Sequence, residues 1–135
     1  MDKNFLALQI PLAFLLYSLG GWIYVLWGIP VRMVVVYHLT WCINSVAHTW
    51  GTKAFKHPHE ARNNTALGII AFGEGWHNNH HHYPNSVNQG FYWWEIDITY
   101  WVLKILSWLG IVWDLKKVPE NILRSSLISN KPKRK

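Results

Sequence analysis

FLALQIPLAFLLYSLGGWIYVLWGI, residues Phe5 to Ile29, contains no formally charged side chain over twenty-five positions. About 20 apolar residues in a helix span the roughly 30 Å hydrocarbon core of a bilayer. Gly20-Gly21 interrupts the stretch, so we expect the first helix to cover about Asn4–Leu19. The residues from Trp22 to Trp27 predict an aromatic turn at the membrane interface, where Trp and Tyr concentrate.

A second apolar helix is predicted from Pro30 to about Trp50. Proline is well placed at the first position of a helix, where its missing N–H has no intrahelical role. Two antiparallel spans put the amino terminus and everything after residue 50 on one side. Eleven of the thirteen Lys and Arg residues follow residue 50, which predicts that this side is cytoplasmic. A buried hairpin in a soluble protein is the alternative.

Composition supports a membrane protein. Half of the residues are apolar and ten are tryptophan, while the net charge is +6. Anionic headgroups attract such a positive charge, and no basic stripe with interleaved aromatic residues predicts a nucleic-acid partner. We therefore predict an all-α, multi-pass integral membrane protein: two transmembrane helices, then a helical cytoplasmic cap with an interfacial amphipathic helix.

Three segments are expected along the chain. Residues 1–50 form the transmembrane hairpin, residues 51–118 the cytoplasmic histidine-rich region with the interfacial helix, and residues 119–135 a basic tail. Within the second segment, a short helical run is expected at Ala66–Phe72. The stretch Trp93–Trp113 is apolar but interrupted by three charges, which are costly at the bilayer centre. It predicts an amphipathic helix lying in the interface, ended by Gly110.

Gly73-Glu74-Gly75-Trp76-His77-Asn78-Asn79-His80-His81-His82 carries the most specific chemistry. Imidazole is the commonest protein ligand for iron, copper and zinc. If the run is helical, His77 shares a face with His80 or His81. Because His80 and His81 diverge by roughly 100°, the pattern suits two neighbouring metals. A solvated histidine tract or an adventitious zinc patch is the alternative.

Further polar groups are candidates for the same site. Asn44 and His48 lie one helical turn apart near the end of the second helix, on a face shared with Trp41 and Ser45, and we expect this face to point inward. His48 can bind metal directly, and Asn44 can hold a metal-bound water. Interhelical hydrogen bonding is the alternative. In the loop after residue 50, His57 and His59 lack partners at ligand spacing and are expected to be solvent-exposed.

Glu74 and His77 form Glu-x-x-His, a pattern that soluble di-iron carboxylate bundles use for ligation. Those bundles need two copies and further carboxylates, whereas this chain has one copy and scattered acids. We therefore expect an all-histidine site in which Glu74 accepts a hydrogen bond from an imidazole and orients it. No catalytic residue beyond the metal ligands is predicted.

Two motifs, Asn44-Ser45-Val46-Ala47-His48-Thr49-Trp50-Gly51 and Gly73–His81, resemble the last two histidine segments of the membrane fatty-acyl desaturases. The likeness is greatest to the stearoyl-CoA delta-9 type and its bacterial and cyanobacterial relatives. Tyr37–Trp41 and Trp93–Lys117 also resemble that family, so the similarity covers essentially the whole chain.

The resemblance implies two iron ions (Fe2+) at the cytoplasmic face, with His48, His77, His80 and His81 as ligands and Asn44 acting through a water. It implies an oxidoreductase that uses dioxygen and two electrons, from cytochrome b5 or ferredoxin, to remove two hydrogens from neighbouring methylenes. The product is a cis double bond, of delta-9 type, in a fatty acyl-CoA or acyl-lipid substrate held in the membrane. His82 lies outside the pattern and receives no role.

The resemblance also exposes a difference. The family's two earlier boxes, His-x4-His and His-x2-His-His, come before the segment that matches Asn44–Gly51, whereas this chain has a single histidine, His38, before Asn44. The iron site is therefore expected to be incomplete, and the chain to be the carboxy-terminal part of a desaturase, inactive alone. A related di-iron hydroxylase and a non-catalytic metal-binding membrane protein remain as alternatives.

Overall fold

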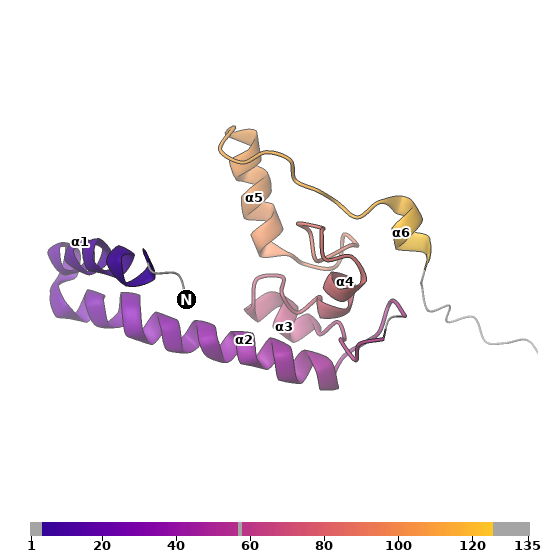
Figure 1. The fold of residues 1–135 in the computed structure, drawn as a ribbon, viewed down its shortest axis with the longest axis horizontal. Helices are drawn as coiled ribbons and strands as arrows, with labels where there is room; N and C mark the ends of the chain where they lie inside the picture. The colour runs from indigo at the N-terminus through magenta and orange to yellow at the C-terminus, as the bar shows by residue number, and fades with distance from the viewer. Residues whose placement is uncertain (1–3, 57, 126–135) are drawn as a thin grey trace, which may run out of the picture. The chain divides into compact units, whose positions relative to one another are not determined.

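The computed structural model describes residues 4–56 and 58–125, within which the chain forms helices, turns and two isolated β-bridges. The chain divides into two compact units, residues 1–40 and 41–135, and each is described by itself (Figure 1). The all-helical fold class is confirmed for the described residues.

The first unit contains α1 (Asn4–Leu26), which is broken at Gly20 and Gly21. Gly21 has a φ of 67°, in the left-handed region that glycine adopts without a Cβ clash. The rings of Tyr17 and Trp22 pack edge to face across the break, with centroids 5.1 Å apart. The break confirms the expected end of the first helix near Leu19.

The predicted aromatic turn is wrong. Residues 22–26 are helical, and a π-helix, η1 (Trp27–Val31), joins them to α2 (Arg32–Thr49). Pro30 lies inside η1 rather than at the start of a helix. Its missing N–H removes an ordinary α-helical hydrogen bond, and the wider turn accommodates this: the Arg32 amide donates to Trp27 O, five residues back.

One helical segment of the described chain, Ala7–Thr49, is long and apolar enough to cross a membrane by length and composition, and it has 43 residues. The sequence predicts two spans in the same region. None of the segment's most apolar stretch is buried within the chain, whereas Ile43 and Ala47 near its end are buried.

The second unit holds the end of α2 and four shorter helices: α3 (Thr65–Ile70), α4 (His77–His82), α5 (Ile98–Trp108) and α6 (Glu120–Ser125). The expected apolar run at Ala66–Phe72 is α3, and Asn64 caps it by accepting from the Leu67 amide at 3.1 Å. The histidine run is helical, as expected, and forms α4.

The helix expected at Trp93–Trp113 is shorter than predicted. Asp97 caps α5 by accepting from the Tyr100 amide at 2.9 Å, so the helix begins at Ile98. Glu95 and Asp97 lie before it in an irregular segment and are 8% and 3% exposed. Both carboxylates are buried because they accept hydrogen bonds from backbone amides outside any helix: the Gln89 amide donates to Asp97 and the Phe91 amide to Glu95. Gly110, with a φ of 70°, follows the helix end as expected.

The backbone just before α4 lies close to the backbone of α3. A Cβ at Gly75 would contact the backbone of Gly68, Leu67 and Asn64. The Asn64 amide donates to Gly75 O at 2.9 Å, and the adjacent Trp76, 5% exposed, donates its indole N–H to Ile96 O. The absence of a side chain at Gly75 thus lets α3 lie against the segment that presents His77.

Candidate metal centre

His48 reaches the candidate site from the last turn of α2. Ile43 and Ala47, on the buried face of this helix, are 8% and 0% exposed. The Arg62 amide donates to Ala47 O at 2.7 Å, so the loop after residue 50 returns to the end of the helix. His48 itself is half-buried.

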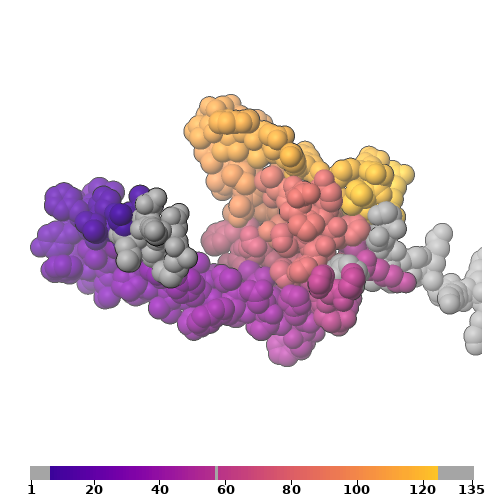
Figure 2. Space-filling view, viewed as in Figure 1, coloured from indigo at the N-terminus to yellow at the C-terminus, as the bar shows by residue number. Residues whose placement is uncertain are grey.

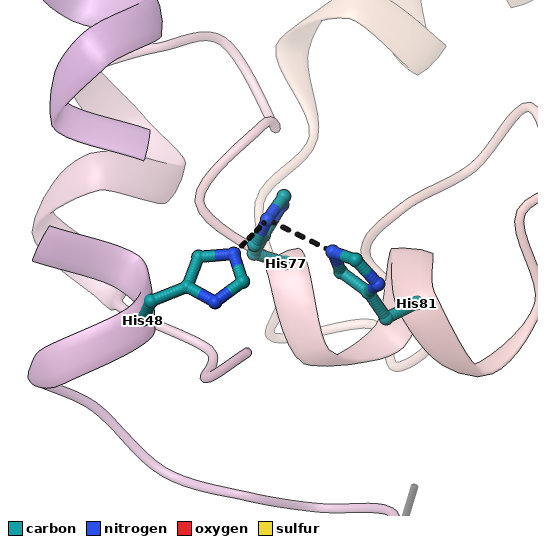
Figure 3. A group of neighbouring side chains, drawn as sticks. All are labelled: His48, His77 and His81. Atoms are coloured by element: carbon teal, nitrogen blue, oxygen red, sulfur yellow. Dashed lines mark hydrogen bonds between the residues drawn. The ribbon is translucent and has the colours of Figure 1, made fainter. Parts of the chain in front are cut away.

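His77 and His81 come from α4, one turn apart, and their side chains point toward His48 (Figure 3). The Nε2 atom of His77 lies 3.0 Å from Nε2 of His48 and 3.1 Å from Nε2 of His81. His77 is buried, while His48 and His81 are half-buried. The three residues form the histidine cluster.

The donor set of the histidine cluster fits a metal ion. Nε2 of a neutral imidazole has either one N–H or one lone pair, so that atom of His77 can satisfy only one of its two contacts by hydrogen bonding. A cation can accept all three lone pairs. Neighbouring nitrogen ligands about 2.1 Å from a metal at right angles lie roughly 3.0 Å apart, close to the separations seen here.

The structure does not bring every predicted site residue into the cluster. His80 is half-buried, and its ring centroid is 6.0 Å from that of His77. Asn44 is exposed one turn before His48, and Trp41 and Ser45 are exposed as well. Of the face expected to point inward, only His48 reaches the cluster; Trp41, Asn44 and Ser45 are exposed, and Ile43 and Ala47 take the buried positions.

Glu74 is exposed, and no hydrogen bond joins its carboxylate to a histidine in the described chain. The carboxylate that bonds into α4 is instead Glu95, which accepts from Asn79 Nδ2 at 2.7 Å. Burial raises the pKa of the Glu95 carboxyl, against the opposing effect of three hydrogen bonds. Burial, and the nearby Glu95 charge, also raise the pKa of Tyr92.

The remaining histidines have distinct surroundings. His59 is exposed as expected, but its ring centroid lies 5.1 Å from that of His81, a proximity that spacing does not predict. His82 stacks on Phe55 with centroids 4.1 Å apart, and its ring N–H donates to Ile122 O. His57 lies outside the described residues.

Asn78 organises the loop beside the cluster. Its side chain is fully buried and uses its whole hydrogen-bonding capacity on backbone groups. Oδ1 accepts from the amides of Ala54 and Phe55 at 2.9 and 2.8 Å. Nδ2 donates to Phe55 O and Ala61 O at 3.2 and 3.0 Å. Sequence reasoning treated Asn78 and Asn79 only as residues interleaved among the histidines.

Fold and site together define a helical protein with a long apolar segment and a candidate histidine metal centre. The sequence profile of a family described as fatty acid desaturase matches residues 3–113. The chain belongs to the fatty acid desaturase family, whose members are membrane-associated oxidoreductases of lipid metabolism.

Curated relatives share this similarity. The chain is 49% identical over 111 residues to an sn-2 palmitoyl-lipid 9-desaturase of Nostoc sp. (strain 36), covering 82% of this chain and 39% of the relative. It is 43% identical to an sn-1 stearoyl-lipid 9-desaturase of Synechocystis sp., and the match covers 90% of this chain and 38% of the relative. An icosanoyl-CoA 5-desaturase of Limnanthes douglasii is 40% identical, and the match covers 86% of this chain and 33% of that relative. The chain thus spans less than two fifths of the length of these relatives.

Proposed function

We propose that this chain is the carboxy-terminal part of a fatty-acyl desaturase that introduces a cis double bond at the delta-9 position of an acyl chain. One observation carries the proposal: three Nε2 atoms converge at 3.0 and 3.1 Å inside the segment that the family profile matches. The Nostoc and Synechocystis relatives are both 9-desaturases by name, which favours this position over others.

The proposed cofactor is a pair of iron ions. His48, His77 and His81 hold one ion, and His80, on another side of α4, contributes to the second together with residues of the upstream part of the protein. Asn44 acts through a water at the exposed end of α2. Iron supplies the oxidising power that side chains lack for breaking unactivated C–H bonds. Within this chain, the buried side chains of Asn63, Asn78 and Asn79 hold the backbone that orients the imidazoles.

Membrane placement is part of the proposal. We assign two spans within residues 1–50, separated near the Gly20–Gly21 break, with residues 51–118 at the cytoplasmic face and 119–135 as a basic tail. The segment around α5 stands out from the second unit (Figure 2). Its Trp108 and the following Trp113 are 75% and 79% exposed.

The charge distribution of α5 supports an interfacial position for it. With Glu95 and Asp97 placed before the helix, Lys104 is its one charged residue. The Lys104 ammonium lies 5.4 Å from the Trp108 ring centroid, in the manner of a lysine whose stem covers apolar surface. Such a helix suits the headgroup level better than either water or the bilayer centre.

The proposed substrates are acyl chains of membrane lipids, with acyl-CoA as the alternative. Both kinds appear in the names of the relatives, and the lipid type belongs to the Nostoc and Synechocystis proteins, at 49% and 43% identity. Cytochrome b5 or ferredoxin is the proposed electron donor. A non-catalytic metal-binding membrane protein is the second candidate, because the chain spans only 38–39% of the length of the two 9-desaturases.

A chimera tests the proposal. Residues 3–113 replace the matching segment of the Nostoc 9-desaturase, and cells expressing the chimera are fed perdeuterated palmitate. Mass spectrometry of the lipids then follows the loss of two deuteriums and the position of the double bond. The same chimera with His77→Ala and the 135-residue chain alone are the controls.

We expect a 9-unsaturated product from the chimera and none from either control. A hydroxylated product would replace the desaturase assignment with a hydroxylase. A correctly inserted, metal-containing chimera without product would favour the non-catalytic candidate.

A further inference from the structure

Glu95 is a buried carboxylate that bonds to one residue of the histidine helix, Asn79. The carboxylate is 8% exposed, and its Oε2 atom accepts three hydrogen bonds. Asn79 Nδ2 and the Phe91 amide donate at 2.7 Å, and the Tyr92 amide donates at 3.2 Å. A buried polar group left without its partner costs free energy, so the bond to Glu95 holds the Asn79 side chain in place.

Asn79 is also hydrogen-bonded to Asn63. The Asn79 side chain is fully buried, and its Nδ2 also donates to Gln89 O at 2.9 Å. Its Oδ1 accepts from Asn63 Nδ2 at 2.7 Å. With both ends of the amide engaged, the orientation of Asn79 is fixed, and Asn63 is fixed with it.

Asn63 in turn caps the histidine helix from outside. Its Oδ1 accepts from the backbone amides of Asn78 and Asn79 at 2.9 and 3.2 Å. These are first-turn amides of α4, which have no partner within the helix. The residue at the N-cap position, Trp76, makes no side-chain capping bond. A helix of six residues is unstable by itself, so this external cap holds the turn that carries His77.

We propose that Glu95 is a positioning residue of the metal centre, acting through Asn79 and Asn63 on the first turn of α4 and so on His77 and His81. The inference rests on the proposed function, because it takes the histidine cluster to be a metal site. Glu95 is not a member of the histidine cluster; it bonds to the side chain of Asn79, which belongs to α4, and Asn63 links that side chain back to the first-turn amides of the helix.

Asp97 provides a matched control. It is a second buried carboxylate, 3% exposed, in the same irregular segment. It accepts from three backbone amides, those of Gln89, Gly90 and Tyr100, and none of these belongs to α4. Removing either carboxylate leaves buried amides unsatisfied, but only Glu95 is linked to the histidine helix by side chains.

The experiment titrates the detergent-purified 135-residue chain with Co(II) and records the visible d–d spectrum, the dissociation constant and the thermal midpoint. Glu95→Leu should weaken Co(II) binding by about tenfold or more and alter the spectrum, as is typical for residues that orient metal ligands. Glu95→Gln, which keeps an acceptor oxygen, should stay within about threefold of the parent. Asp97→Leu should lower the thermal midpoint while leaving the spectrum unchanged.

Equal effects of Glu95→Leu and Asp97→Leu on Co(II) affinity would overturn the inference, as would no effect of Glu95→Leu. If Glu95→Leu does not fold, Glu95→Asp replaces it, since the shorter side chain withdraws the acceptor by about 1.5 Å. Weakening in Glu95→Asp but not in Glu95→Gln then supports the inference, and parent-like affinity in both overturns it. If His77→Ala binds Co(II) as the parent does, the metal site itself fails, and this inference fails with it.

Discussion

The Nε2 atoms of His48 and His77 lie 3.0 Å apart, although 29 residues separate the two histidines in the chain. The connection between them is held by two isolated β-bridges and by buried asparagine side chains. Asn78 bonds to backbone groups of Ala54, Phe55 and Ala61, and Asn63 bonds to the start of α4. The geometry of the candidate metal centre therefore depends on a few buried side-chain amides, so single substitutions at these residues should disturb it.

His77 and His82, at the two ends of α4, should have different roles: His77 in metal binding and His82 in stability. Because Nε2 of His77 is central to the cluster, His77→Ala should lower Co(II) affinity by more than the about 10–100-fold typical of losing a residue that only orients a ligand. His82→Ala removes a stacking contact and one hydrogen bond, so it should cost about 2 kcal/mol of stability. Its Co(II) affinity should stay near that of the parent. Parallel Co(II) titration and thermal unfolding measure both effects, and equal affinity losses would contradict the cluster.

Asn78 should tolerate no loss of its amide donors. Asn78→Asp keeps the shape but turns carboxylate oxygens toward Phe55 O and Ala61 O, so we expect a loss of about 3 kcal/mol in the free energy of unfolding. Asn85→Asp, at an exposed position after α4, is the control and should change stability little. Denaturant unfolding in detergent compares the two. Similar stability of both variants would show that the buried amide does not fix the loop.

Gly75 should not accept a side chain. Gly75→Ala places a Cβ against the backbone of Gly68 and Leu67, which has no flexible end to move away, so we expect a loss of at least about 3 kcal/mol. Gly110→Ala is the control: its φ is 70° but no atom lies within 4 Å of the added Cβ, so strain of about 1–2 kcal/mol is expected. Thermal unfolding of both variants tests this ranking, and the reverse order would contradict the close approach of α3.

Glu95 should make stability depend on pH. Its folded-state pKa is raised above the ordinary value of 4.5 by burial, so the folded state binds the proton more tightly than the unfolded state does. The stabilising effect is present below pH 4.5 and is lost as pH rises through the raised pKa. The thermal midpoint of the parent minus that of Glu95→Gln should therefore fall as pH rises above 4.5. A difference that is constant or rises with pH would contradict the direction of the shift.

The local features of the site were predictable from sequence. Histidines four residues apart share a helix face, and Gly20-Gly21 marks the end of the first helix. Asn44 and His48 were both expected to point inward; His48 reaches the cluster, whereas Asn44 is exposed, and Ile43 and Ala47 take the buried face. Spacing gives the angle between side chains but not which side meets other segments.

Long-range polar contacts were not predictable in this way. Glu95 and Asp97 fit the pattern of an interrupted amphipathic helix, although an Asp just before an apolar run also indicates an N-cap. Which carboxylate bonds to α4 depends on how the loops close, and a single sequence does not contain that information. Pro30 was expected to start a helix, but the π-helical turn accommodates it without ending the helical segment.

The iron content of the detergent-purified Nostoc chimera tests most directly whether these histidines belong to a desaturase metal centre. We predict two iron atoms per folded chimera, fewer in the His77→Ala version, and almost none in the 135-residue chain alone. A chimera that is folded and inserted in the membrane, yet contains no iron whether or not His77 is present, would contradict that assignment.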